Sequence, residues 1–325
     1  MKIGVVGLGA VGGLLAARLA AAGHEVSALT RGATLAAVRA NGLRVQQQGG
    51  LLRAAVNASD DPHAIGPQEL VIVALKAQAL EGAVPLVQAL RAPGGVVLPT
   101  MNGVPWWFLQ AHTPADAQPL RSVDPQGHIA AALPLDAVLG GVVHFASSCP
   151  EPGVVRHGFG QRLIVGEPCG GPSARTDAVV AALASAGFET EASDDIRREI
   201  WFKLWGNMTM NPVSALTGAT ADAILDDPDV AAFMLRAMSE AAEIGARIGC
   251  PIAQSGEARM AVTRQLGAFK TSMLQDAEAG RTLELDALVT AVQEIGRRMA
   301  VPTPHIDALL GLTRVMARQR GLYPR

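Results

Sequence analysis

The feature that most constrains the fold is the first stretch of the chain, where a short apolar run meets three glycines. Ile3 to Val6 lead into Gly7-Leu8-Gly9-Ala10-Val11-Gly12, an apolar helical pattern continues to Ala22, and a second β-type run covers Glu25 to Leu29. This order predicts a strand, a tight turn, a helix and a second strand. A unit of this kind and length is typical of a dinucleotide-binding fold.

Each glycine of the turn has a separate expected role. Gly7 permits the turn, Gly9 lets the backbone approach a pyrophosphate, and Gly12 lets the helix pack closely on the strand, while free helix N–H groups bind the phosphates. A glycine-rich turn that serves packing alone is the alternative. The position after a strand and before a helix favours cofactor binding by Gly7, Leu8, Gly9, Ala10, Val11 and Gly12.

The charge balance narrows the classes of binding partner. A formal net charge of −2 over 325 residues gives no broad attraction to nucleic acid or to an anionic membrane, so any phosphate recognition must come from local groups. The length suggests about two domains. We expect no nucleic acid partner and no membrane association, because no leader precedes the first strand and no run approaches the roughly 18 apolar residues of a membrane span.

Cysteine and histidine usage bears on the compartment and on metal binding. Cys149, Cys169 and Cys250 form no CxxC pair and leave an odd count, which fits free thiols in a reducing compartment, so we expect a cytoplasmic protein. His128, His144 and His157 lack the spacing of metal ligands, and we expect no metal site.

Two apolar runs place polar side chains at one edge of the expected sheet. Lys76 follows Leu70 to Leu75, which has the composition of a strand covered on both faces, and Asn102 follows the run Val96 to Leu98. Because the carboxyl ends of parallel strands face the ligand crevice, we predict that Lys76 contacts the cofactor and that the Asn102 amide reaches the nicotinamide or the substrate. The alternatives are a lysine that ends a strand in solvent and an ordinary Asn-Gly turn.

The stretch from Trp106 to Asp136 has an irregular composition, which indicates a long excursion rather than a core element. Its residues Trp106, Trp107 and Phe108 either cover a pocket or pack the excursion down, and packing is the favoured interpretation. β-type runs return over 139–145, 153–157 and 162–166, where we expect two short antiparallel strands. A helix over 174–186 and a run over 188–191 then complete the first domain, 1–193.

Helical patterning dominates from residue 194 to residue 325. Lys203, Asn207 and Asn211 recur at i, i+4 and i+8, so one stripe of a helix carries an ammonium and two amides among apolar residues. Asparagine is a poor helix former and buried polar groups are costly unless satisfied, so a functional stripe is favoured over a solvated or domain-facing surface. Pro212 is expected to end this helix.

Thr282 and Glu284 are expected to begin a long helix whose apolar positions continue to Ile295. The helix dipole favours a glutamate in the first turn, so capping electrostatics is the simplest role for Glu284. The whole pattern predicts an α/β chain in which an N-terminal Rossmann-type dinucleotide-binding domain is followed by an all-α C-terminal domain, 194–325.

Short motifs along the chain carry a resemblance to one enzyme family. They are GLGAVG at 7–12, LKAQ around Lys76, MNG around Asn102, WFKLWGNMTMNPVSALTG around Lys203, KTSMLQD around Ser272, RTLELD around Glu284, and AVPTP late in the last domain. On these motifs the chain resembles the 2-dehydropantoate 2-reductase (ketopantoate reductase) family. The resemblance implies a Rossmann domain, a helical domain, an active site between them, and NADPH-dependent reduction of a 2-keto acid to pantoate.

The resemblance also implies roles for residues of the second domain. Lys203 is expected to be the general acid that stabilises the keto oxygen and supplies its proton. Asn207, Asn211 and Ser272 are expected to contact the substrate and orient it. Glu284 is expected to be an active-site carboxylate near the cofactor, which adds to the capping role above.

The cofactor expectation rests on two further positions. Asn102 would bridge the nicotinamide and the substrate. Arg31 matches the family's contact to the 2′-phosphate of NADPH, and charge agrees, because an NAD enzyme would carry Asp or Glu near the end of the second strand, where this chain has Thr30-Arg31. NADPH is therefore expected over NADH.

Other functions remain open from the sequence. A related NAD(P)-dependent reductase could act on another 2-keto acid or on an opine-like substrate, and a protein that binds NADPH without catalysis would keep the same turn. The segment between Asn102 and Gly140 is longer than in compact members of the family, and an insertion there could reshape the substrate pocket. The aromatic stretch or the Ala-rich helices could form a homodimer interface.

Overall fold

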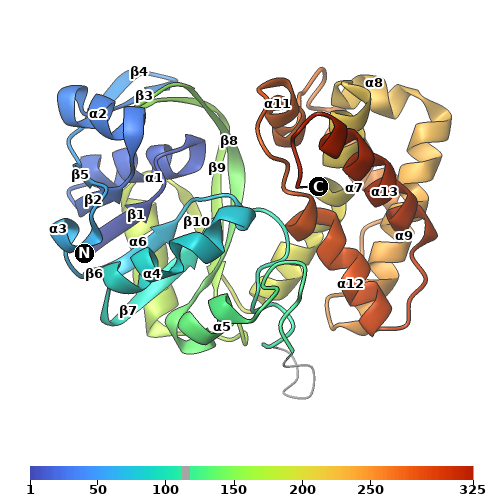
Figure 1. Cartoon of the computed structure of the whole chain (residues 1–325), viewed down its shortest axis with the longest axis horizontal. Coiled ribbons are helices and arrows are strands. Elements are labelled where there is room, and N and C mark those ends of the chain that lie inside the picture. Colours follow the sequence, from blue (N-terminus) through green and yellow to red (C-terminus); the bar gives the residue numbers. More distant parts are fainter. Residues whose placement is uncertain (112–117, 325) are drawn as a thin grey trace. The chain divides into compact units, whose positions relative to one another are not determined.

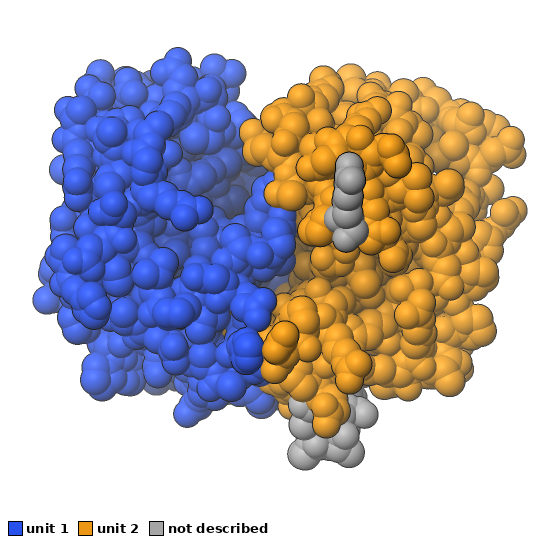
Figure 2. Space-filling view, viewed as in Figure 1, with its two compact units in different colours: residues 1–101, 127–199 blue, residues 102–126, 200–325 orange. Residues whose placement is uncertain are grey.

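The chain forms two compact units in a computed structural model that describes residues 1–111 and 118–324. Unit 1 contains Met1–Met101 and Gly127–Glu199, and unit 2 contains Asn102–Gln126 and Ile200–Arg325 (Figure 2). The expected boundary after residue 193 lies near the last point at which the chain passes from unit 1 to unit 2, between Glu199 and Ile200. The segment 102–126, which the sequence grouped with the first domain, packs with the helices because Phe108 stacks on Trp201 with ring centroids 5.9 Å apart.

A parallel sheet forms the first layer of unit 1 (Figure 1). Its strand order is β5-β2-β1-β6-β7, and all neighbours are parallel. The bounds are Lys2–Val6 for β1, Glu25–Leu29 for β2, Asn57–Ser59 for β5, Gln68–Val73 for β6 and Arg91–Pro99 for β7. The chain moves outward from β1 to β5 and then returns to β6, so the strand order reverses between β1 and β6. Ligands of such sheets bind at this reversal, outside the carboxyl ends of the strands.

A second sheet of unit 1 has the order β10-β9-β3-β4, with β8 paired to β9. The bounds are Leu43–Gln47 for β3, Gly50–Ala54 for β4, Gly140–Glu151 for β8, Val154–Gly166 for β9 and Glu189–Ser193 for β10. β3 and β4 form an antiparallel pair. β8 and β9 are much longer than the predicted short strands, because their antiparallel pairing continues through register shifts after His144 that interrupt the alternating pattern.

The helices of unit 1 are α1 (Ala10–Ala21), α2 (Gly32–Asn41), α3 (Pro62–Ile65), η1 (Ala77–Ala79), α4 (Leu80–Leu90), α5 (His128–Ala132), η3 (Leu135–Ala137) and α6 (Ala174–Ser185). α1 packs against both sheets. A Cβ on Gly12 would lie 2.0 Å from the Gly7 carbonyl oxygen, and one on Gly13 would lie 2.6 Å from Val155 of β9. α5 and η3 fall in the stretch predicted to be irregular, and residues 112–117 of that stretch lie outside the described residues.

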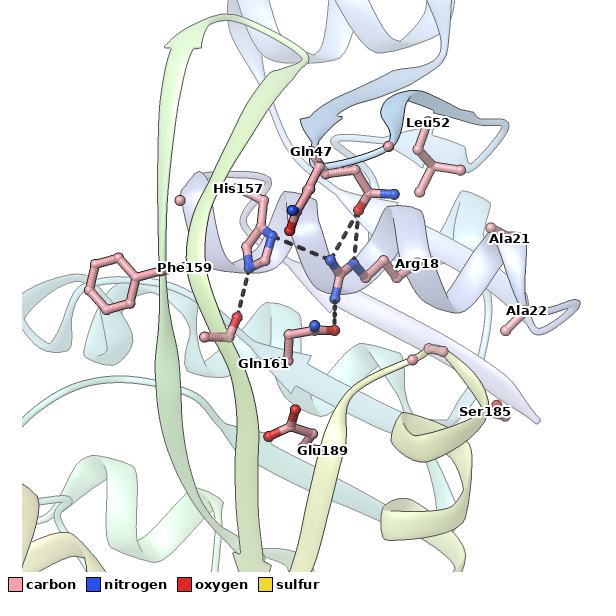
Figure 3. A pocket seen from close by; sticks show the side chains of 16 residues that line it. Arg18, Ala21, Ala22, Gln47, Leu52, His157, Phe159, Gln161, Ser185 and Glu189 are labelled. Carbon is pink, nitrogen blue, oxygen red and sulfur yellow. Dashed lines mark hydrogen bonds between the residues drawn. The ribbon is translucent and has the colours of Figure 1, made fainter.

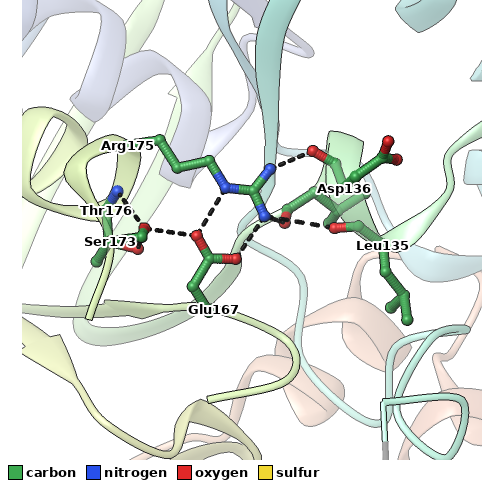
Figure 4. Close-up of polar contacts among 7 residues, drawn as sticks. Leu135, Asp136, Glu167, Ser173, Arg175 and Thr176 are labelled. Atoms are coloured by element: carbon green, nitrogen blue, oxygen red, sulfur yellow. Dashed lines mark hydrogen bonds and ion pairs between the residues drawn. The ribbon is translucent and has the colours of Figure 1, made fainter. Parts of the chain in front are cut away.

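Arg175 of α6 forms an ion pair with Glu167, which follows β9, and hydrogen bonds with the segment before β8 (Figure 4). Arg175 on α6 donates through Nε to Glu167, 2.7 Å away at the end of β9, and its terminal nitrogens donate to Glu167 and to the backbone carbonyls of Leu135, Asp136 and Val138. The hydrogen bond from Arg175 lowers the pKa of Glu167. The pair has a structural task, which is to pin η3 against the sheet.

Unit 2 is built from helices, and its described residues form no strand. Its helices are α7 (Ile196–Thr217), whose first turn belongs to unit 1, α8 (Ala221–Asp226), α9 (Pro228–Arg247), α10 (Gly256–Arg264), α11 (Ser272–Glu278), the π-helix η4 (Asp286–Thr290), α12 (Ala291–Arg298) and α13 (Pro304–Gln319). The mixed α/β unit followed by the helical unit confirms the predicted fold class. No helix within the described part of the chain is long and apolar enough to span a membrane.

The end of α7 differs from the prediction. Pro212 was expected to stop the helix at Asn211, but α7 continues to Thr217 with the proline inside it. Met210, Val213 and Ala215 are all buried around this point, so packing outweighs the lost hydrogen bond and the local preference against helix. Two indole N–H groups also hold α7 to α9, since Trp201 donates to the Ala241 carbonyl and Trp205 to that of Met238.

Candidate active site

The glycine-rich turn after β1 has the geometry that its three glycines predict. Gly7 has a φ of +91°, where side chains are strained, and a Cβ at Gly12 would collide with the Gly7 carbonyl. Gly9 is different, because it is exposed and nothing lies within 4 Å of the place where its Cβ would be. Gly7 and Gly12 therefore meet protein, whereas Gly9 faces open space at the N-terminus of α1, as a pyrophosphate site requires.

The other residues predicted to hold the cofactor lie in unit 1. Within the turn, Leu8 is buried, while Ala10 and Val11 begin α1 and are partly buried. Lys76 follows β6 and precedes η1. Arg31 follows β2, precedes α2, and is exposed. All of them lie just beyond the carboxyl ends of β1, β2 and β6, the edge where the strand order reverses.

Lys203 and Asn102, which are 101 positions apart in sequence, meet in unit 2. The Lys203 ammonium donates a hydrogen bond to the side-chain oxygen of Asn102 at 2.8 Å. Burial lowers the pKa of Lys203 to about 8, the nearby Glu284 carboxylate opposes this effect, and the Arg259 guanidinium adds to it. A lysine with a pKa near neutrality can hold a proton and release it, which is the property of a general acid.

The position of Asn102 depends on the backbone that follows it. Gly103 has a φ of +91°, and a Cβ there would lie 2.6 Å from the carbonyl oxygen of Ala287 in η4. The next residue, Val104, donates its N–H to that same carbonyl at 2.8 Å. π-helical turns often occur at functional sites. Here η4 supplies the acceptor that fixes the loop carrying the partner of Lys203.

Asn207 and Asn211 follow Lys203 along α7, as the spacing predicts. Asn207 is partly exposed, and Asn211 is buried with 6% of its surface accessible. In the described ranges, neither side-chain amide hydrogen-bonds to protein. A buried amide without a partner is costly, so Asn211 is suited to bind a polar ligand, and the partly exposed Asn207 amide is open to one as well.

Glu284 and Ser272, the two remaining predicted site residues, both lie at or just before the start of a helix. Glu284 was expected in the first turn of a helix, but it precedes the helix, which begins at Leu285 and passes at once into the π-turn η4. Ser272 is the exposed first residue of α11, where Thr271 is the N-cap. The structure brings Asn102, Lys203 and Glu284 together, whereas Ser272 has no side-chain hydrogen bond to any of these three described residues.

The aromatic residues after Asn102 pack rather than cover a pocket, as predicted. Trp106, Trp107 and Phe108 are each at most 2% exposed. The described residues also contain no cluster of three or more histidine, cysteine or acidic side chains that could hold a metal ion.

A separate hollow of about 980 Å³ lies in unit 1 and contains none of the predicted site residues (Figure 3). Arg18 of α1 crosses it and donates to the side-chain oxygens of Gln47 and Gln161 and to Nδ1 of His157. His157 in turn donates from Nε2 to the Gly160 carbonyl at 2.7 Å. These groups satisfy one another, so the network ties α1 to β3 and β9 and leaves little for a ligand.

Sequence reasoning missed one charged residue near Lys203. Arg259 of α10 lies with its guanidinium 5.1 Å from the centroid of the Phe202 ring. The sequence contained one weak indication that Arg259 has a role beyond a surface ion pair, because no acidic residue lies three or four positions away in its own helix. Its nearness to α7 depends on the packing of two helices and could not be read from either one.

Comparison with known proteins gives matches over nearly the whole chain. Residues 3–169 match the family model described as Ketopantoate reductase PanE/ApbA, and residues 195–317 match the one described as Ketopantoate reductase PanE/ApbA C terminal. A 2-dehydropantoate 2-reductase of Mesorhizobium japonicum is 43% identical, covering 99% of this chain and 100% of that protein. A crystal structure from Ralstonia solanacearum MolK2, provisionally called a ketopantoate reductase, is 56% identical with a TM-score of 0.95, covering 99% of both chains. The ternary structure of D-mandelate dehydrogenase with NADH and anilino(oxo)acetate, 20% identical with a TM-score of 0.83 over 99% and 100% of the chains, is similar in fold.

Proposed function

The chain belongs to the ketopantoate reductase family of NAD(P)-dependent oxidoreductases, and we propose that it uses NADPH to reduce 2-dehydropantoate (ketopantoate) to pantoate. The observation that carries the proposal is the hydrogen bond between Lys203 and Asn102, made by a lysine whose pKa lies near 8. A reductase of this class needs a proton donor next to the keto oxygen. The relatives' names supply the substrate, and the residues of unit 2 supply groups suited to it.

The turn after β1 fits a dinucleotide. The open space at Gly9 and the free N–H groups of the first turn of α1 would receive the pyrophosphate, and Lys76 lies beside the same sheet edge. When bound, NADPH supplies the hydride that reduces the keto carbon. In this proposal Asn102 and Glu284 are among the residues of unit 2 that would contact the keto acid.

The residues of unit 2 then divide the work. Lys203, protonated, donates a hydrogen bond to the keto oxygen, stabilises the negative charge that grows there, and gives up its proton. Asn102 orients the ammonium through the 2.8 Å hydrogen bond, and Glu284 keeps the protonated form favourable. Asn207, Asn211 and Ser272 would hold the polar groups of the acid so that the keto carbon has one orientation.

Substrate turnover tests the proposal directly. Purified protein is mixed with NADPH or NADH and a panel of 2-keto acids, and absorbance of the reduced nicotinamide is followed. We expect rapid oxidation of NADPH with ketopantoate and slower oxidation with other acids. Turnover with a different keto acid would establish the alternative reductase, and binding of NADPH without turnover on the whole panel would establish a non-catalytic protein.

Arg31 is proposed to set the preference for NADPH. Replacing Arg31 by alanine is expected to weaken NADPH binding by about 10- to 100-fold, the worth of a charge-assisted contact to phosphate, and to leave NADH binding unchanged. Nicotinamide fluorescence titration measures both affinities without turnover. Arg53→Ala, which removes another exposed arginine of unit 1, is the matched control. Equal losses for NADPH and NADH would contradict this role.

The protein's assembly and compartment are part of the same proposal. We propose a homodimer, since a Staphylococcus aureus ketopantoate reductase of similar fold is described as dimeric, and light scattering with sedimentation would measure the mass. We also propose the cytoplasm as its compartment, because Cys149, Cys169 and Cys250 form no disulfide within the described part of the chain.

A further inference from the structure

Arg259 carries a positive charge that no described acidic residue pairs with. Its guanidinium stacks on Phe202, burial lowers its pKa, and its Nε is buried with no hydrogen-bond partner among the described residues. No carboxylate in the described ranges forms an ion pair with it. A buried donor left unpaired costs free energy, and a buried charge costs more, so the arrangement calls for an acceptor that the protein does not itself supply.

The guanidinium lies directly against α7 at Gly206. A Cβ on Gly206 would be 2.9 Å from Nε and 3.2 Å from a terminal nitrogen of Arg259. Gly206 stands three residues after Lys203 on the same helix, so its missing side chain leaves room for Arg259 near Lys203. Phe202 lies one turn before Gly206, and it supplies the flat surface on which the guanidinium rests.

The local charge favours an anionic ligand. Arg259 and Lys203 are close enough for the guanidinium to depress the pKa of the ammonium, and Glu284 is the carboxylate that acts on Lys203 in the opposite direction. The positive charge of Arg259 forms no ion pair with any carboxylate among the described residues, so it is left uncompensated. A ligand with a single negative charge would neutralise it.

We propose that Arg259 binds the carboxylate of the 2-keto acid, so that the substrate lies across Arg259 and Lys203. The planar guanidinium can donate two parallel hydrogen bonds to a carboxylate, which an ammonium cannot do. In a 2-keto acid the carboxylate carbon is bonded to the keto carbon, so an anchor at Arg259 would place the keto oxygen at the neighbouring Lys203. The site would accordingly select 2-keto carboxylates over uncharged ketones. This inference rests on the proposed reduction of a keto acid.

The test compares a charged substrate with an uncharged one. Wild type and Arg259→Met are assayed with NADPH and the keto acid that wild type reduces fastest, and then with the amide of that acid. We expect the methionine variant to raise KM for the acid by about 10- to 100-fold, the worth of a charge-assisted pair, while KM for NADPH changes less than twofold. Its preference for the acid over the amide should disappear, a change that general damage to the fold would not produce.

Two further variants keep the test decisive. Arg259→Lys retains the charge without the planar fork and should give an intermediate KM for the acid. Gly206→Ala retains the arginine but fills the space beside Nε, and it should also raise that KM. Arg264→Met, on the same helix but paired with Asp226, is the control and should behave as wild type.

The possible outcomes separate the two proposals. Wild type that reduces no keto acid would overturn the proposed function. Wild type that does so, together with an Arg259→Met variant that keeps its KM for the acid and its preference over the amide, would overturn the role of Arg259. A rise in KM for NADPH with no change for the acid would also overturn it, because it would make Arg259 a cofactor contact.

Discussion

Replacing Lys203 by alanine is expected to lower kcat for keto-acid reduction by about 10²- to 10⁴-fold, the range that general acid catalysis supplies. Alanine removes both the proton donor and the positive charge that faces the keto oxygen. Because Lys203 also holds the Asn102 side chain, the loop that carries Asn102 should become less ordered. Nicotinamide fluorescence titration should show NADPH bound with nearly wild-type affinity, which separates a loss of chemistry from a loss of cofactor.

The pH profile gives a second measure of the same residue. Burial lowers the pKa of Lys203 to about 8, so the fraction of protonated lysine falls as pH rises through that value. For wild type, kcat/KM is expected to fall about tenfold per pH unit above this point, and Lys203→Ala should lack this limb. Lys2→Ala, which removes an exposed lysine, should keep it. A wild-type profile that is flat from pH 7 to 10 would rule out Lys203 as the proton donor.

Alanine substitutions at two glycines of the turn after β1 should differ in their effect on stability. Gly12→Ala places a methyl group 2.0 Å from the Gly7 carbonyl, so α1 must move away from β1. We expect a loss of at least about 3 kcal/mol in the free energy of unfolding, together with loss of NADPH binding. Gly9→Ala meets no protein atom within 4 Å and has an ordinary φ of −76°, so the fold should keep its stability.

The NADPH affinity of Gly9→Ala distinguishes a turn that binds the cofactor from one that serves packing alone. If the pyrophosphate lies against Gly9, the new methyl group should weaken binding by about 10- to 100-fold, which corresponds to the few kcal/mol of a steric overlap. Thermal unfolding and fluorescence titration measure the two effects independently. A Gly9→Ala variant with both wild-type stability and wild-type NADPH affinity would show that the turn serves packing rather than a cofactor.

Local chemistry explains which parts of this structure could be predicted from the sequence. The turn at Gly7 was predictable because its φ of +91° is a property of the residue and its neighbours. The spacing of Lys203, Asn207 and Asn211 was predictable because helical periodicity is local. The family resemblance rested on short sequence motifs that occur in a fixed order along the chain, and the matches to the family models confirm it.

The remaining features depend on contacts between distant parts of the chain. Pro212 lowers the local preference for helix, yet the packing around it keeps α7 intact. The hydrogen bond between Lys203 and Asn102 joins residues 101 positions apart, and the sequence around each of them does not predict this contact. The π-turn η4 has no periodicity of its own that a pattern of apolar positions would reveal. Such features require the packed structure.

The grouping of Asn102–Gln126 with the helices has a consequence for the order in which the protein is made. During synthesis this segment leaves the ribosome before α7, so Phe108 stays exposed until Trp201 has been made and can stack on it. Apolar residues that are exposed during synthesis can bind chaperones or other unfolded chains. Unit 2 can close only when the last helices have been translated. A shortened chain that starts at residue 194 would hold Lys203 but lack Asn102, and would leave Trp201 without its stacking partner.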